Sequence, residues 1–233
     1  MAAALLLAWA MPVSAEAPVP ARVEMSVVVE MGGVTVGEGR DVFEHEGGRY
    51  RVVSEARTAG VARLLKRVDE RRESRGSITA QGLRPARFHQ ERTGRAPRTA
   101  VFDWEHRRLE LSEGEDRETV ELPDPTLDQT SLPYAFVFTP PPQGGFRVHV
   151  TDGRRLPDYE LSLVGRERIR TRLGEMDTLH YRKVLRGDDR RGLEFWLSLD
   201  HYRLPVRIRV LEKDGTAFDS TVVRLETTGR PTP

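Results

Sequence analysis

Four arginines at alternate positions form the clearest pattern of possible chemistry in this sequence. They are Arg166, Arg168, Arg170 and Arg172. In an extended strand, alternate side chains leave the same face, so these guanidinium groups would lie roughly 6 to 7 Å apart. Guanidinium binds phosphate and carboxylate through paired hydrogen bonds, so the row predicts a site for anionic head groups, phosphates or acidic glycans. The alternative is an exposed strand face opposite glutamates of a neighbouring strand.

Two apolar stretches predict a pocket for an acyl chain or a peptide. If the concave side of a curved sheet is only partly filled, side chains from both stretches would line that pocket. The residues predicted to line it are Tyr134, Phe136, Phe138, Phe195, Trp196 and Leu197. Alternation places Phe195 and Leu197 on one strand face and Trp196 on the other. Ordinary core packing is the alternative explanation of the same residues.

Enzyme motifs are missing from the sequence. The chain has no cysteine and no Gly-x-Ser-x-Gly segment, so an activated nucleophile of the usual kinds is not indicated. The six histidines lack the spacing of a metal site, and no Walker A or Rossmann glycine motif occurs. Asp103 and Asp200 are possible members of a glycosidase-type carboxylate pair, with turn formation as the alternative. We therefore predict no catalytic residue, no metal and no cofactor.

The elements that must position these side chains are strands. In the stretch 206–210, Val206, Ile208 and Val210 alternate with two arginines, which is the period of a half-buried strand. The same pattern recurs along the chain, and the pairs Gly32-Gly33 and Gly47-Gly48 are suited to tight hairpins. The sequence predicts a mainly β protein, a curved antiparallel sheet in the form of a half-barrel or open barrel, with one or two short helices.

The predicted helix spans Asp124 to Leu132, because Asp124 can cap free amides and Pro125 is tolerated in the first turn. A short helical turn is also plausible within 60–67. We expect a single β-rich domain over 23–226, with a weak boundary possible at 139–145.

Composition restricts the class of protein further. The chain has 233 residues, of which 31% are charged, with a formal net charge of +1. A nucleic-acid-binding protein would usually carry a basic excess, so that class is disfavoured. The absence of cysteine excludes a lipoprotein attachment site, disulfides and thiolate zinc sites.

The first residues predict export. Residues 1–15 combine an apolar run with Pro-Val-Ser-Ala at its end, which is typical of a secretory signal peptide cleaved after Ala15. Residues 16–22 form a Pro/Ala spacer, and residues 227–233 are expected to be a disordered tail. The expected product is periplasmic, without a transmembrane span after cleavage.

Several separated motifs carry a resemblance to a known family. They are Phe195-Trp196-Leu197 before Asp200, Leu204-Pro205-Val206-Arg207-Ile208 before Asp214-Gly215, Gly82-Leu83-Arg84-Pro85 and Leu173-Gly174. Together they resemble the domain of unknown function 3108 family, secreted proteobacterial proteins without an established activity. The tryptophan, aspartate and Leu-Pro arrangement also resembles periplasmic lipoprotein carriers and the sensor domain that regulates the envelope sigma factor. That resemblance implies a half-barrel over an apolar cavity.

The sequence therefore favours a secreted or periplasmic, non-enzymatic envelope protein. We expect it to bind a lipid or amphipathic ligand, a glycan or an envelope protein partner, in or on a half-barrel sheet. The alternatives are a carboxylate-dependent hydrolase of an envelope polymer and a partner-binding regulator of an envelope response.

Overall fold

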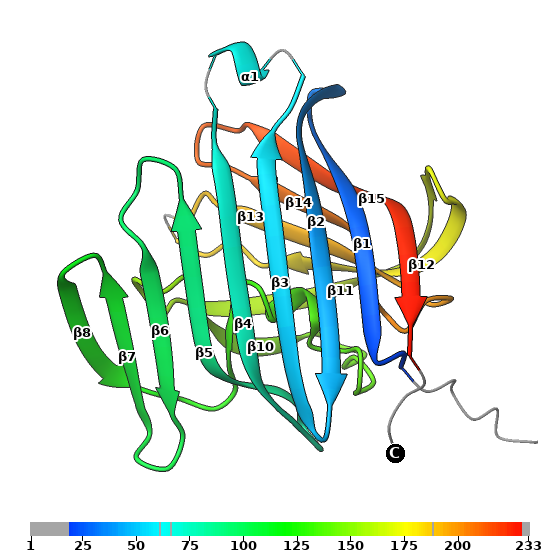
Figure 1. Ribbon diagram of the computed structural model, residues 1–233. Helices are drawn as coiled ribbons and strands as arrows, with labels where there is room; N and C mark the ends of the chain where they lie inside the picture. The colour runs from blue at the N-terminus through cyan, green and yellow to red at the C-terminus, as the bar shows by residue number, and fades with distance from the viewer. Residues whose placement is uncertain (1–18, 61, 66, 188, 230–233) are drawn as a thin grey trace, which may run out of the picture.

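A computed structural model describes residues 19–229, except for residues 61, 66 and 188. The predicted signal peptide, 1–15, lies outside the described residues. Within the described part, fifteen strands form one sheet in the order β8-β7-β6-β5-β4-β3-β2-β1-β15-β14-β13-β12-β11-β10-β9. The predicted curved, largely antiparallel sheet is therefore confirmed (Figure 1).

The first arm of the sheet is a meander in which each strand pairs with the next. Its strands are β1 (Arg22–Met31), β2 (Val34–Glu46), β3 (Arg49–Thr58), β4 (Asp69–Thr79), β5 (Gly82–Arg92), β6 (Arg98–Asp103), β7 (Arg108–Glu113) and β8 (Asp116–Glu121). The predicted glycine turns join the first three strands, and all four of these glycines have positive φ. Only glycine adopts such angles without steric cost.

The second arm returns from the far edge of the sheet to β1. Its strands are β9 (Thr126–Asp128), β10 (Phe146–Thr151), β11 (Asp158–Thr171), β12 (Gly174–Lys183), β13 (Gly192–Ser198), β14 (Pro205–Leu211) and β15 (Ala217–Thr228). β15 pairs antiparallel with β1 and joins the two arms. β9 is the exception, because it pairs with β10 in parallel.

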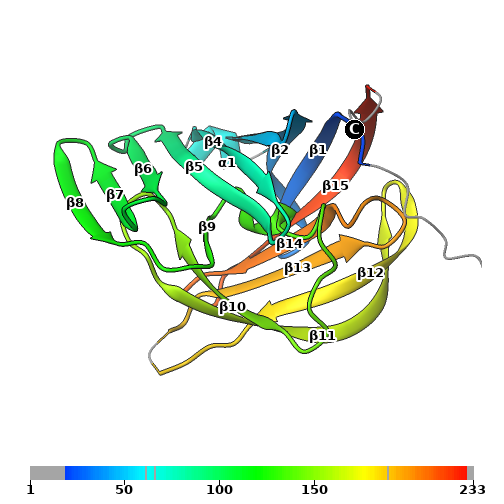
Figure 2. The same cartoon turned by 90° about the horizontal axis from the view of Figure 1, so that it is seen from below.

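The sheet doubles back on itself, so that its two arms face each other as layers (Figure 2). Register shifts within the strand pairs accompany this curvature, as bulges bend a strand and increase its twist. They fall at Ser26/Val27, Val29/Glu30, Arg75/Gly76, Leu163/Gly165 and Trp196/Leu197.

The core fills the space between the two arms. Val23, Phe43 and Tyr50 of the first arm and Tyr181 and Phe195 of the second belong to one buried cluster. The connection from β8 to β10 runs through this space and adds buried residues of its own to the cluster, among them Leu127, Leu132, Tyr134, Phe136 and Val137. A second cluster lies under β5–β8.

The predicted helix at 124–132 is wrong. Residues 126–128 form β9, and only Leu132–Tyr134 makes a short 3-10 helix, η1. The Asp128 carboxylate accepts hydrogen bonds from the backbone N–H groups of Thr130 and Ser131. Local bonds of this type offer the backbone an alternative to the helix, so the segment turns instead of continuing.

The structure also tests two local predictions, one for residues 60–67 and one for the residues from 227 onward. The helical turn expected within 60–67 is present as α1 (Ala62–Leu65). Residues 227 and 228, expected to belong to a disordered tail, instead pair with β1 in the sheet. Residues 230–233 lie outside the described residues.

Candidate functional site

The predicted apolar residues come together inside the molecule. Phe136 stacks on Tyr181 at a centroid distance of 5.6 Å, and Tyr181 stacks on Phe195 at the same distance. Phe195 and the neighbouring Leu197 have no exposed surface, and Phe138 is partly buried at the edge of the core. Whether these residues bind a ligand stays a prediction, since in this structure they contact one another.

Tyr134 lies deeper in the same interior and fixes the connection between β8 and β10. Its ring stacks on Phe43 at 5.4 Å, and its hydroxyl donates a hydrogen bond of 2.9 Å to Asp41. Burial raises the pKa of both Tyr134 and Asp41 above their ordinary values. Arg203 adds a bond of 2.6 Å from its Nε to the carbonyl of Phe136. The segment 126–138 therefore occupies the interior through specific polar bonds as well as packing.

Trp196 belongs to the same buried cluster but projects from the face of β13 opposite to that of Phe195, as alternation requires. Its indole N–H donates to Glu167 at 2.8 Å, while His180 stacks on one side at 4.2 Å and Arg207 lies over the ring at 4.8 Å. The His180 ring nitrogens lie 3.2 Å from Glu167 and 2.7 Å from Glu194. Within this group His180 and Trp196 are buried, whereas Glu167 is exposed.

The row of four arginines is partly neutralised. Arg168 makes two hydrogen bonds with Asp177, of 2.7 and 3.1 Å, and Arg170 donates to Glu175 at 3.3 Å. These carboxylates lie on β12, directly opposite the two arginines. Arg166 and Arg172 form no ion pair with any described residue. An anion site built on all four guanidinium groups remains a prediction, and carboxylates already satisfy two of them.

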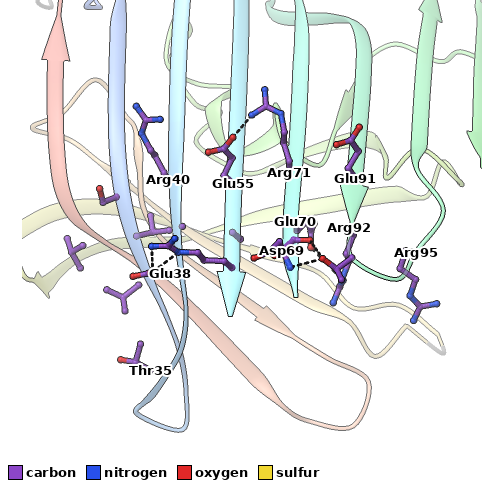
Figure 3. Close-up of a pocket in the computed structure, with 18 of the residues that line it drawn as sticks. Thr35, Glu38, Arg40, Glu55, Asp69, Glu70, Arg71, Glu91, Arg92 and Arg95 are labelled. Carbon is purple, nitrogen blue, oxygen red and sulfur yellow. Dashed lines mark hydrogen bonds and ion pairs between the residues drawn. The ribbon is translucent and has the colours of Figure 1, made fainter. Parts of the chain in front are cut away.

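The site that the geometry itself indicates lies on the outside of the first arm. There a groove of about 1190 Å³ extends over the ends of β1–β5 (Figure 3). Its charged lining is nearly balanced between acidic and basic groups. The charged residues are Glu38, Arg40, Glu55, Arg57, Asp69, Glu70, Arg71, Glu91, Arg92, Arg95 and Arg172.

The centre of this groove is one row of side chains across four strands. Arg40 is opposite Glu55, Glu55 is opposite Arg71, and Arg71 is opposite Glu91. Asp41, the residue after Arg40, faces inward, as the bond from Tyr134 shows. Because strand side chains alternate, the row itself points outward. The result is a surface on which positive and negative charges alternate, as Figure 3 shows.

Ion pairs between neighbouring strands hold these side chains in place. Arg40 donates to Glu24 at 2.6 Å and lowers the pKa of that carboxyl, and Arg57 donates to Glu38 at 2.7 Å. Arg71 bonds to Glu55. Exposed pairs of this kind add little stability, so their regular arrangement mainly fixes where each charge stands.

Sequence reasoning missed this groove, although the signal is present. Arg40, Glu55, Arg71 and Glu91 lie in four different strands of the chain, and each stretch by itself looks like a solvated strand face. Only the register of the meander brings them into one row. Given that register, the alternation of signs could have been read from the sequence.

Two classes of feature are missing from the described part of the chain. Among residues 19–229 with their gaps, no three His, Asp or Glu side chains gather as ligands of a metal ion would. None of the helices described there has the length and apolar character that a membrane crossing requires.

Solved structures resemble this chain at low sequence identity, and the first of them shares its fold. The β-barrel-like protein of domain of unknown function DUF1849 from Brucella abortus is 10% identical, with a TM-score of 0.52, and the match covers 92% of this chain and all of that one. MucB in the MucA/MucB complex of Pseudomonas aeruginosa is 15% identical, with a TM-score of 0.38 over 91% of this chain and 53% of that one.

A second structure of MucB gives similar figures, with 15% identity and a TM-score of 0.37 over 91% of this chain and 55% of that one. No protein of curated function matches the sequence. A family model does match, over residues 24–222, and its description is "Protein of unknown function (DUF3108)". With most of its length matched, and with the predicted motifs inside that range, the chain belongs to the DUF3108 family.

Proposed function

We propose that this protein is a non-enzymatic binding protein of the bacterial envelope, and that its charged groove receives a polar segment of a protein partner. The observation that carries the proposal is the alternating row of Arg40, Glu55, Arg71 and Glu91 in the groove over β1–β5. The periplasmic location belongs to the proposal and is supported by the apolar run at residues 1–15.

The chemistry of the groove favours a partner with charges of both signs. A lipid tail would gain nothing from ion pairs, and an acidic glycan would meet carboxylates at every second position. A peptide segment with its own alternating charges can match the row, and such complementarity chiefly gives specificity and a fast association rate.

Binding in the interior would require a different conformation. Segment 126–138 occupies that space, held by the bonds from Tyr134 to Asp41 and from Arg203 to Phe136. A ligand would have to displace these contacts and the stacked aromatic rings. The outer groove needs no such rearrangement, so the geometry favours it as the binding surface.

A charge swap tests the proposal. The double variant Glu55→Arg with Arg71→Glu keeps an ion pair between β3 and β4 but breaks the alternation that a partner meets, because the row then reads Arg, Arg, Glu, Glu. The matched control is Arg168→Asp with Asp177→Arg, which swaps an exposed ion pair on β11 and β12. Each variant carries a photo-crosslinking residue in place of Ser26, at the groove, and is expressed in its native cells.

We expect one defined protein adduct in the wild-type background, reduced about tenfold by the groove swap and unchanged by the control. Higher salt should weaken the adduct, because exposed charges are screened. An adduct that is insensitive to the groove swap, or a lipid adduct in its place, would argue against the proposed partner.

A further inference from the structure

A second surface on the same arm departs from the alternation of signs. Arg51 on β3 is directly opposite Arg75 on β4, and Arg75 is directly opposite Arg87 on β5. Side chains directly opposite in an antiparallel pair have Cβ atoms about 4.5 to 5.5 Å apart, and like charges there are unfavourable. Three arginines thus stand side by side, whereas the groove places opposite signs in the same relationship.

Only one of these three arginines forms an ion pair with a carboxylate of the described residues. Arg51 makes two hydrogen bonds of 3.0 Å with Glu73, and this interaction lowers the pKa of Glu73. Glu73 also accepts a bond of 3.4 Å from Arg71. Arg75 and Arg87 form no ion pair with any described residue, and both side chains are exposed. The two arginines therefore stand opposite each other on neighbouring strands with their guanidinium donors available.

The backbone draws these two strands close together beside the pair. The register shifts between Arg75 and Gly76, and a Cβ on Gly76 would lie 2.1 Å from the carbonyl oxygen of Arg84. This tight approach fixes the backbone of Arg75 relative to the backbone of Arg87. A hollow of about 200 Å³ lies between them, lined by Glu73, Arg75, Arg87 and His89.

The other groups around the hollow already have partners. The two ring nitrogens of His89 lie 3.1 Å from Thr99 and 3.1 Å from Glu91. Glu73 already accepts hydrogen bonds from Arg51 and Arg71, and its charge also acts on Arg75 without a hydrogen bond. The polar groups left to meet a ligand are the two guanidinium groups, each a planar fork of donors that matches the oxygens of an oxyanion.

We propose that Arg75 and Arg87 bind a phosphate group between β4 and β5. A phosphate dianion offsets both positive charges and offers oxygens to two forks that approach from different strands, which a single planar carboxylate does less completely. This site is separate from the charged groove and needs no protein partner. The phosphate can belong to a soluble ligand or to a lipid head group, and the two sources give different results below.

Titration of the full chain with inorganic phosphate at low ionic strength tests the site, with sodium chloride at equal ionic strength as the reference. We expect phosphate-specific chemical-shift changes at Arg75 and Arg87, and an affinity about tenfold weaker in either Arg75→Gln or Arg87→Gln. The matched control is Arg117→Gln, an exposed arginine on β8 without an ion pair to any described residue, which should bind phosphate as the wild type does.

The folded state of each variant is checked by its thermal unfolding. Because like charges are removed, we expect Arg87→Gln to unfold at the same or a higher temperature than the wild type. Phosphate should raise the unfolding temperature of the wild type but not that of the double variant Arg75→Gln with Arg87→Gln, since a ligand stabilises only a state that binds it.

Binding to vesicles of phosphatidylcholine, with and without phosphatidylglycerol, shows whether the phosphate belongs to a lipid head group or to a soluble ligand. Binding to the phosphatidylglycerol vesicles that inorganic phosphate reverses would assign the site to a lipid head group. Phosphate binding without vesicle binding would assign it to a soluble ligand. Phosphate effects no larger than those of chloride, or effects that survive both substitutions, would overturn the site.

Discussion

The Ser74 hydroxyl donates a hydrogen bond of 2.5 Å to the Asp128 carboxylate, and both side chains are fully buried. Ser74 lies on β4 near the middle of the first arm, and Asp128 lies on β9 at the far edge of the second. The Tyr50 hydroxyl lies 3.1 Å from Ser74 Oγ and extends the chain of polar contacts. Side chains thus join parts of the sheet that share no strand ladder.

The bond predicts that Asp128 stabilises the folded state. Asp128→Ala would leave the hydroxyl of Ser74 and the amides of Thr130 and Ser131 buried without their acceptor. We expect a loss of about 1–3 kcal/mol or more in the free energy of unfolding, measured with urea. Asp116→Ala, at an exposed position of β8, is the control and should change stability little. Equal losses in the two variants would contradict the role of Asp128.

The free energy of unfolding should change with pH because Asp128 titrates. Burial raises the pKa of Asp128 above its ordinary 3.8, against the opposing effect of its hydrogen bonds. The folded state therefore holds this proton more tightly than the unfolded chain. The resulting stabilisation is fully present below pH 3.8 and is lost as the pH rises through the folded-state pKa.

Asp128→Asn removes this titration and leaves the other groups in place. We therefore expect the stability difference between wild type and Asp128→Asn to be larger at acid pH than at neutral pH. Parallel urea titrations of both proteins across that range measure it. A difference that grows as the pH rises would mean that the folded-state pKa of Asp128 is lowered instead.

The bond from Tyr134 to Asp41 should stabilise the segment that fills the interior. Tyr134→Phe keeps the stacking on Phe43 but removes the hydroxyl that reaches Asp41 at 2.9 Å. We expect a loss of about 1 kcal/mol, because the partly buried Asp41 keeps one donor fewer. Tyr159→Phe is the matched control, since the Tyr159 hydroxyl forms no hydrogen bond with the described residues. Hydrogen exchange of the amides at 130–138 should rise in Tyr134→Phe alone.

The close approach of β4 and β5 predicts that Gly76 tolerates no side chain. In Gly76→Ala the new Cβ would lie 2.1 Å from the Arg84 carbonyl oxygen and 2.7 Å from Pro85 Cα, so the strands must separate. We expect a loss of about 2 kcal/mol or more in the free energy of unfolding. Gly144→Ala has no atom within 4 Å of its Cβ and should change stability by less than about 0.5 kcal/mol.

The sequence determined the strands, because alternation and glycine turns are local properties. Val206, Ile208 and Val210 alternate with arginines, and the structure places Val206 in the buried core with Ile208 packed against it. The same local reasoning failed for Asp124 to Leu132, where the contacts of Asp128 with a distant strand and with its own amides decide the conformation.

The two proposed sites depended on the tertiary structure. Arg75 faces Arg87, and Arg40 faces Glu55, only because the register of the strands sets which side chains stand opposite each other. A shift of one residue would exchange the two faces of a strand. That register is fixed by core packing and bulges across the whole meander, which no short stretch of sequence contains.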